Sequence, residues 1–377
     1  MNLRTRHYAG PMDDIRYGVI GTGMMGVEHI ENLAAVDGAV VTAIADTDEG
    51  SRNRGLAACS EAGWSPQVYA DHQDMLSGDI VDAVVVATPN FTHVDVLSDV
   101  LHTDLHVLVE KPLCTSTRDC LTVIAGHEAR IASGSNAIVW MGLEYRYMPP
   151  VTKLINEVKD GAVGDVKMVG IREHRFPFLE KVGDWNRFSA NTGGTWVEKC
   201  CHYFDLMNQI VGSRPVRVMS SGGQVNNHLD ETYEGRRSDI LDSGYAIVEY
   251  DNNVRALLDL CMFADATRNQ EELSVVGTTG KAEAHIPDYT YRFGQRGIHG
   301  IGAVHEEVVI DAAVKVQGFH HGSSYLEHLD FATAMRDGTP PLVTLDDGLW
   351  SVAVGEAAHR SIEEDRWVRV DEILPAS

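Results

Sequence analysis

Two parts of the sequence combine the residue types that acid–base chemistry requires. Lys111 follows an apolar run and is flanked by Glu110 and Pro112. An ammonium group at the carboxyl end of a strand can bind a substrate oxygen and stabilise the negative charge that develops on it. Glu198 and His202 are four residues apart, so a continuous helix would place them on one face. The imidazole of His202 titrates near neutral pH and could accept a hydroxyl proton, with Glu198 orienting the ring.

Each candidate also has a purely structural interpretation. Lys111 could be a solvated lysine that follows a strand, and His202 could be a structural histidine of a helix. A metal centre within residues 198–202 is a third possibility, but successive helical side chains diverge by about 100° and cannot converge on one ion. We therefore predict no metal site. We interpret four further histidines as loop residues: His299, His305, His320 and His321.

The stretch that would bring a cofactor to these residues lies near the amino terminus. An apolar run ending at Ile20 is typical of a strand and breaks into Gly21-Thr22-Gly23-Met24-Met25-Gly26, followed by apolar residues at helical spacing. The first glycine allows a sharp turn, the second leaves room for a pyrophosphate, and the third lets helix and strand pack closely. The helix N-terminus then offers free N–H groups to the phosphates. A second predicted strand ends at Asp46, where a carboxylate accepts the ribose hydroxyls of a dinucleotide.

Strands and helices alternate through the first 141 residues. Residues 80–87 and 105–109 are rich in β-branched residues, as expected of buried parallel strands. Ligands of such sheets bind at the carboxyl ends of the strands. We therefore predict a doubly wound parallel sheet in a dinucleotide-binding domain of residues 1–141. In addition to the glycine turn and Asp46, its predicted cofactor contacts are Thr88, Pro89, Asn90, His93, Glu110 and Lys111. The predicted helices include 49–62, 71–76, 93–101 and 118–132, the last of them capped by Thr115.

From residue 142 the pattern changes to longer strands in which apolar and polar residues alternate. This alternation is typical of an antiparallel sheet with one exposed face, and it predicts an α+β second domain of residues 142–377. The strands are predicted at 165–175, 216–222, 243–250, 253–263, 271–276 and 281–286, and the helices at 149–159, 193–211, 325–336 and 345–362. The last helix is a candidate to pack back on the first domain. Residues 226–240 and 289–318 are polar or glycine-rich and are predicted to be loops.

The composition limits the kind of protein this can be. The chain has 377 residues with 44% hydrophobic and 23% charged residues, which is typical of a globular protein of two domains. The formal net charge of −24 argues against a nucleic-acid or anionic-membrane partner. The six cysteines form no disulfide-like pattern, which favours a reducing cytoplasm. The first dozen residues contain basic side chains but no apolar core, so we interpret them as a leader and not as a secretion signal.

Together these motifs resemble the Gfo/Idh/MocA family, named for glucose–fructose oxidoreductase, inositol dehydrogenase and a rhizopine-catabolism protein. The resemblance extends from Tyr17 to about Val370. It rests on the glycine turn, Ala45-Asp46, Ala87-Thr88-Pro89-Asn90 with His93, Glu110-Lys111-Pro112, Tyr145-Arg146-Tyr147 with Pro149, and Gly193-Gly194 leading to His202 and Asp205.

The resemblance implies a Rossmann domain, a second domain with a large, mostly antiparallel open sheet, and NAD or NADP as cofactor. It also implies that Lys111 and His202 are catalytic, that the bond between Lys111 and Pro112 is cis, and that the protein is a homodimer or homotetramer. Asp46 favours NAD, because its carboxylate would repel a 2′-phosphate. The chain departs from the inositol-dehydrogenase pattern at Glu198, where the pattern has aspartate, and at Lys199-Cys200-Cys201, where small residues are common.

Several polar side chains ahead of Gly193 could line a carbohydrate pocket. Arginines can bind hydroxyl, carboxylate or phosphate groups, and Trp185 could stack on a sugar ring. The alternative is that most of these residues belong to the faces of the sheet. The predicted substrate-binding residues are Lys111, Arg146, Arg172, Trp185, Glu198 and His202, with His174, Arg175, Asn186 and Arg187 as further candidates.

We expect the protein to oxidise a secondary ring hydroxyl of a cyclitol or sugar with NAD. His202 would take the proton, Lys111 would polarise the oxygen and Glu198 would orient His202. Three alternatives remain: an oxidoreductase or epimerase that retains its cofactor through the cycle, a reductase of a keto-sugar, and a catalytically silent sugar sensor that keeps the dinucleotide fold.

Overall fold

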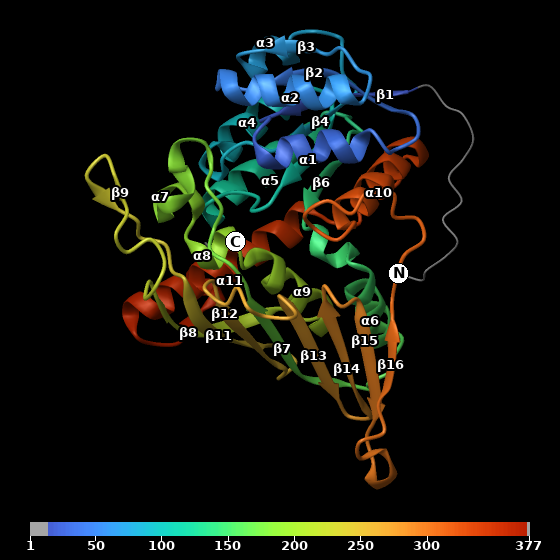
Figure 1. Ribbon diagram of the computed structural model, residues 1–377, viewed down its shortest axis with the longest axis vertical. Coiled ribbons are helices and arrows are strands. Elements are labelled where there is room, and N and C mark those ends of the chain that lie inside the picture. The colour runs from blue at the N-terminus through green and yellow to red at the C-terminus, as the bar shows by residue number, and fades with distance from the viewer. Residues whose placement is uncertain (1–13, 375–377) are drawn as a thin grey trace.

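The computed structural model describes residues 14–374, so the predicted leader lies outside the described residues. Two β-sheets occupy opposite ends of the molecule, with helices between them (Figure 1). No helix within residues 14–374 combines the length and the apolar character that a membrane crossing requires.

The first sheet has six parallel strands in the order β3-β2-β1-β4-β5-β6. The strand order reverses between β1 and β4, so the segments that follow these two strands border one crevice. Every residue of β4 and the last four of β5 are buried, which explains their continuous apolar sequences. The strands are β1 Ile15–Ile20, β2 Ala39–Ala45, β3 Gln67–Tyr69, β4 Ala83–Val86, β5 His106–Glu110 and β6 Val139–Gly142, and the helices are α1 Met24–Leu33, α2 Glu49–Glu61, α3 His72–Leu76, α4 His93–Val100 and α5 Thr117–Ala132.

The second sheet has nine strands in the order β16-β15-β14-β13-β7-β12-β11-β8-β17. Only the pairing of β7 with β12 is parallel among the described strands of this sheet. The fold class predicted from the sequence is therefore confirmed. The strands are β7 Val166–His174, β8 Pro215–Gly223, β11 Ser243–Tyr250, β12 Arg255–Cys261, β13 Glu271–Gly277, β14 Gly280–Ile286, β15 Thr290–Gln295, β16 His305–Val308 and β17 Val368–Arg369.

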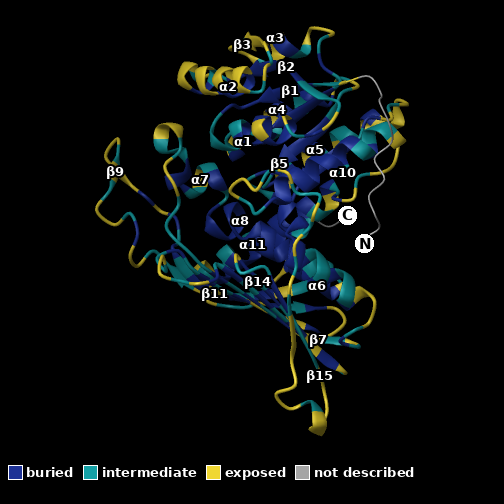
Figure 2. Cartoon of the chain, turned by 45° about the vertical axis from the view of Figure 1, so that its right-hand side comes forward, coloured by how far each residue is buried: buried dark blue, intermediate teal, exposed yellow. Residues whose placement is uncertain are grey.

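One face of this sheet is covered by helices and the other is open. The covering helices are α6 Pro149–Lys159, α9 Cys201–Val211 and α11 Leu345–Glu364. Buried and more exposed residues alternate along β11, as expected for a strand with a single covered face. Figure 2 shows the buried residues concentrated in the helices between the two sheets.

Three local predictions were wrong. The predicted helix 193–211 is interrupted: α8 covers Thr195–Glu198, and α9 begins only at Cys201. Ser116, and not Thr115, caps α5, because its side chain accepts the N–H of Asp119. Both predicted loops contain short strands, β9 Thr232–Tyr233 and β10 Arg236–Arg237 in the first and β15 and β16 in the second. These edge strands and hairpins carry little apolar alternation, which is the signal by which strands are found in a sequence.

Helix α10 (Ser323–Asp337) follows the second sheet in the chain but packs against the first. Phe331 of this helix is fully buried. Its ring centroid lies 6.4 Å from that of Tyr17 on β1 and 6.0 Å from that of Trp140 on β6. The amino-terminal core is therefore completed by a segment from the carboxyl-terminal part of the chain.

Replacing Phe331 by alanine should destabilise this core. The substitution Phe331→Ala removes a buried ring and leaves a cavity, which typically costs about 3–5 kcal/mol of unfolding free energy. Differential scanning calorimetry should therefore show a clearly lower transition temperature. Leu342→Ala is the control, because Leu342 is 50% exposed. Equal transition temperatures for the two variants would contradict the assignment of α10 to this core.

Candidate active site

The glycine turn after β1 leaves an open approach to the N-terminus of α1. Gly21 has φ +89°, and a Cβ atom there would lie 2.6 Å from the carbonyl oxygen of Ala87. A Cβ on Gly26 would lie 1.9 Å from the carbonyl oxygen of Gly21, so neither position accepts a side chain. A Cβ on Gly23 would meet no atom within 4 Å, and no side chain caps α1. Backbone N–H groups thus face free space, which fits the pyrophosphate of a dinucleotide.

Asp46 lies beside this turn, directly after β2. Its carboxylate accepts the backbone N–H of Thr22 at 2.7 Å and that of Asp48 at 2.8 Å. These two bonds fix the carboxylate next to the glycine turn. Met24 and Met25 form the first turn of α1 and are partly exposed there. A group on the ribose of a cofactor seated on the turn would therefore meet a fixed negative charge.

The segments after β4 and β5 are tied together by a histidine. His93 is fully buried, and its ring nitrogens lie 2.9 Å from the carbonyl oxygen of Pro112 and 3.0 Å from that of Thr88. His93, which the sequence predicts as a cofactor contact, spans the two strand ends. Pro89 and Asn90 follow Thr88, and Asn90 turns its amide toward the second domain.

Lys111 stands where β5 ends, and its bond to Pro112 is cis, as the family resemblance implies. The carboxylate of Glu110 lies 2.8 Å from Nε2 of His29 and accepts the backbone N–H of Lys111 at 3.1 Å. The Lys111 ammonium donates to the carbonyl oxygen of Glu198 at 3.0 Å. Burial by itself would lower the pKa of Lys111, but the nearby carboxylates of Glu198 and Glu110 outweigh it and raise the pKa, so the side chain carries its charge.

His202 lies in the first turn of α9 and is almost completely buried. Its ring stacks on the ring of Tyr145, with centroids 3.9 Å apart and an angle of 7° between the planes. Its Nδ1 has no hydrogen-bond partner within the described part of the chain. Burial, together with the charges of Lys111 and Lys199, lowers the pKa of His202 well below its ordinary value. The imidazole is therefore neutral at physiological pH and available as a base.

The predicted partnership of Glu198 with His202 is not observed. The carboxylate of Glu198 accepts the amide N–H of Asn90, on the first-domain side. The interruption between α8 and α9 accounts for this, because residues four apart share a face only on a continuous helix. Glu198 remains part of the site through its backbone carbonyl, which binds Lys111.

Both arginines that the sequence predicts as substrate contacts, Arg146 and Arg172, have carboxylate partners in the structure. The guanidinium of Arg146 bonds Asp205, with Nε 2.6 Å from Oδ2, and lies 3.1 Å from the carboxylate of Asp347, so its charge is already matched. Arg172 is on the open face of β7 and pairs with Glu272 on β13 at 2.5 Å, because inward and outward residues alternate along the strand.

The remaining residues that the sequence predicts to line a carbohydrate pocket lie in different parts of the structure. Trp185, in the turn η3 (Val182–Arg187), packs against Phe91 beside the crevice, with 6.4 Å between ring centroids. His174 shares the open face with Arg172 and pairs with Asp259. Asn186 and Arg187 are buried and bond the carbonyl oxygen of Leu179. Arg175 lies 3.4 Å from the buried carboxylate of Glu173.

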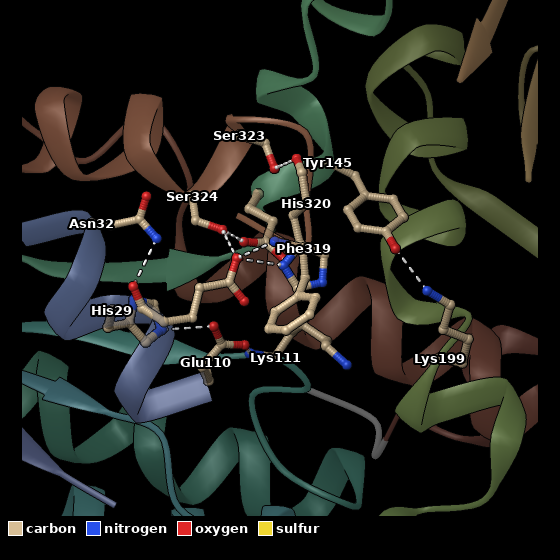
Figure 3. A network of polar contacts seen from close by, with 12 residues as sticks. His29, Asn32, Glu110, Lys111, Tyr145, Lys199, Phe319, His320, Ser323 and Ser324 are labelled. Atoms are coloured by element: carbon tan, nitrogen blue, oxygen red, sulfur yellow. Dashed lines mark hydrogen bonds and ion pairs between the residues drawn. The ribbon is translucent and has the colours of Figure 1, made fainter. Parts of the chain in front are cut away.

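His320, interpreted as a loop residue, belongs to a buried polar network (Figure 3). Its Nδ1 lies 3.3 Å from a carboxylate oxygen of Glu28 and 3.4 Å from one of Glu144. Burial would lower the pKa of His320, but these two carboxylates raise it, so the ring favours its charged form. Its centroid lies 6.0 Å from that of Tyr145. The surrounding sequence is polar, and nothing in it signals that this histidine is enclosed.

Sequence reasoning also missed Tyr145 and Lys199 as neighbours of the site. The Lys199 ammonium lies 2.7 Å from the hydroxyl of Tyr145 and 3.0 Å from the carboxylate of Glu173. Among the residues from 14 to 374, no three His, Cys, Asp or Glu side chains are grouped so that they could hold a metal ion. The site thus combines a charged lysine, a neutral histidine and a cradle for a dinucleotide.

Comparisons with known proteins agree with this architecture. Residues 15–132 match the description "Oxidoreductase family, NAD-binding Rossmann fold", and residues 155–370 match "Oxidoreductase family, C-terminal alpha/beta domain", the two parts of the Gfo/Idh/MocA model. A myo-inositol 2-dehydrogenase of Thermotoga maritima is 27% identical over 96% of this chain and 100% of its own. An inositol 2-dehydrogenase of Paenarthrobacter aurescens is 33% identical over 93% of this chain and 97% of its own.

Among solved structures, levoglucosan dehydrogenase in complex with NADH and levoglucosan has the same fold. The TM-score is 0.80 at 17% identity, over 95% of this chain and 100% of that one. Both halves of the chain, and not the nucleotide-binding half alone, therefore have counterparts in known oxidoreductases. The chain belongs to the Gfo/Idh/MocA family of oxidoreductases, with an NAD-binding Rossmann domain followed by the α/β domain of that family.

Proposed function

We propose that this protein uses NAD to oxidise a secondary ring hydroxyl of a cyclitol or sugar to the ketone. The proposal rests chiefly on one contact, the hydrogen bond of 3.0 Å from the Lys111 ammonium to the carbonyl oxygen of Glu198. This contact joins the carboxyl end of β5, at the cofactor crevice, to the segment that carries His202. The charge of Lys111 is also near enough to lower the pKa of His202, so a charged lysine and a neutral histidine are close together.

The two side chains have complementary roles in alcohol oxidation. The neutral imidazole of His202 accepts the hydroxyl proton, and the Lys111 ammonium stabilises the negative charge that develops on the oxygen. The nicotinamide ring of the cofactor, when bound, takes up the hydride. Glu198 supports the reaction by holding Lys111 in its charged form, a role that differs from orienting His202.

The substrate class is supported by the names of the relatives. The curated relatives described above are named inositol 2-dehydrogenases, and the solved structure of levoglucosan dehydrogenase contains an anhydro-sugar. All of these substrates are polyols with secondary hydroxyl groups on a ring. The fixed carboxylate of Asp46 supports NAD over NADP.

We expect Lys111→Met to abolish most of the turnover while sparing the cofactor site. Removing one preorganised donor to a developing oxyanion typically lowers kcat by about 10²- to 10³-fold. The assay is NADH formation across a panel of inositols, free sugars and glycosides, with NAD and NADP compared. Isothermal titration calorimetry should show NAD binding unchanged within about threefold, because the Lys111 ammonium bonds the carbonyl oxygen of Glu198 and not the glycine turn that would hold the pyrophosphate.

Lys281→Met is the matched control, since Lys281 is half-exposed on β14 and pairs only with Glu283 among described residues. Unchanged turnover in Lys111→Met would refute the role of Lys111. A silent panel for the natural chain, despite NAD binding, would instead favour a cycle that retains its cofactor or a sensor.

Asp46→Ser should shift cofactor preference toward NADP. The substitution removes the negative charge that repels a 2′-phosphate, and a like-charge contact of this kind is worth several kcal/mol. The ratio of kcat/KM for NAD to that for NADP should fall by about tenfold or more, measured with one substrate. Asp74→Ser, at an exposed position on α3, should leave the ratio unchanged. An unchanged ratio in Asp46→Ser would contradict the role given to this carboxylate.

We also propose that two or more copies associate through the open face of the large sheet. Apolar side chains are exposed on that face, among them Met168 at 61% and Leu257 at 40%. Association would remove them from water, which is favourable. Size-exclusion chromatography with light scattering should give a mass of at least two chains, and Met168→Lys with Leu257→Lys should lower it. A single-chain mass for the natural protein would refute this proposal.

A further inference from the structure

We propose that Tyr145 is the positioning residue for the catalytic imidazole of His202, and that the ion pair of Lys199 with Glu173 holds Tyr145 in place. The inference rests on the proposed function for the role of His202 as base. It answers a question that the geometry raises: no carboxylate orients this histidine, since Glu198 is bound to Asn90 and Nδ1 of His202 has no partner in the described chain.

The orienting contact is a flat stack of two rings. Tyr145 belongs to the turn η2 (Glu144–Tyr147), and His202 lies in α9. With centroids 3.9 Å apart and planes within 7° of each other, the imidazole cannot rotate out of its plane without leaving the phenol face. The ring of Tyr203 packs edge-on against that of Tyr145, with 5.7 Å between the ring centroids. All three rings are buried, so the stack has no solvent-filled space into which it could relax.

Tyr145 is itself fixed at its hydroxyl group. The Lys199 ammonium donates to the phenol oxygen at 2.7 Å and pairs with the carboxylate of Glu173 at 3.0 Å. Glu173 is completely buried on β7, so the ion pair joins the phenol to the rigid sheet. A buried ammonium needs such partners, because an unpaired one would lose its hydration without compensation.

The interrupted helix explains how one segment both anchors Tyr145, through Lys199, and places His202 against its ring. Lys199 lies between α8 and α9, and Cys200 donates its N–H to Thr195, five residues back, so the regular helical spacing is lost there. Lys199 therefore reaches the sheet while His202, three residues on, lies against Tyr145. Figure 3 shows Lys199 meeting the hydroxyl end of Tyr145. Lys199, the first residue of the Lys-Cys-Cys segment, thus has a structural role.

The charges around His202 favour its neutral form. Positive groups face it from four elements: Lys111 after β5, Lys199 before α9, Arg175 after β7 and His320 before α10. The carboxylates of Glu173 and Glu271 face Lys199, and those of Glu28 and Glu144 face His320. Tyr145 and Tyr203 are uncharged, since burial raises the pKa of both phenols. The stack therefore holds a neutral base in one orientation.

The test compares Tyr145→Leu, Tyr145→Phe and Lys199→Met with two controls. Ile131→Ala changes an apolar side chain that is 47% exposed on α5, and Lys281→Met changes a half-exposed lysine. The first measurement needs no substrate: the pKa of His202 by NMR of ring-labelled histidine, with its signal identified by its loss in His202→Gln. The second is kcat and KM for a substrate found in the panel.

Tyr145→Leu should raise the pKa of His202 by about one unit or more, because the loosened ring gains access to water. Lys199→Met should also raise it, because one opposing positive charge is removed. In Tyr145→Leu kcat should fall by about tenfold to a hundredfold with KM changed less than threefold, as expected when only the geometry of proton transfer is disturbed. Tyr145→Phe keeps the stack of rings. Its His202 pKa and its kcat should therefore lie between those of Tyr145→Leu and those of the natural protein.

A His202 titration that is the same in Tyr145→Leu as in Ile131→Ala would overturn the inference, whatever the enzyme turns over. A shifted titration with unchanged kcat would also overturn it. If the natural protein turns over nothing in the panel, the proposed function fails, and the titration alone still decides whether Tyr145 positions His202. If Tyr145→Leu or Lys199→Met does not fold, as judged by circular dichroism, Tyr145→Phe tests the hydroxyl anchor alone, and a His202 titration equal to that of the natural protein would then overturn the role of Lys199.

Discussion

The site depends on a single ammonium group that is shared between the two domains. Lys111 is anchored on one side by the Glu110–His29 pair, at the cofactor crevice, and on the other by the carbonyl oxygen of Glu198. A carbonyl oxygen is free to accept this bond because the helix is interrupted directly after Glu198. An uninterrupted helix would use that oxygen in its own ladder. The interruption therefore leaves this carbonyl oxygen available to Lys111.

Charge compensation explains why so many ionisable groups can be buried near this point. Each positive group has a named carboxylate beside it: His29 has Glu110, Lys199 has Glu173, Arg146 has Asp205 and His320 has Glu28. Buried charges persist only when they are paired in this way. The Nδ1 atom of His202 has no hydrogen-bond partner in the described part of the chain, and the ring is neutral. His202 thus differs from these pairs at the place where proton transfer requires a base.

The sequence predicted the fold well because its signals are local. The turn from Gly21 to Gly26 and the buried runs before Thr88 and Lys111 identify the parallel sheet, and alternation identifies most strands of the second one. The site was predicted only in part, because its remaining features depend on tertiary contacts. No glycine or proline marks the helix interruption at Lys199, and strand alternation alone does not tell that Glu173, and not Arg172, faces inward. His320 lies in a polar segment whose enclosure is decided by α1 and α10.

The return of the chain to its first sheet affects how the protein is made. Phe331, Leu349 and Val352 belong to the same buried cluster as Tyr17 and Val84. During synthesis the amino-terminal half emerges from the ribosome long before these residues do, although nascent domains generally fold in order from the amino terminus. The nucleotide-binding half must therefore wait, with part of its apolar surface uncovered, until almost the whole polypeptide has been translated.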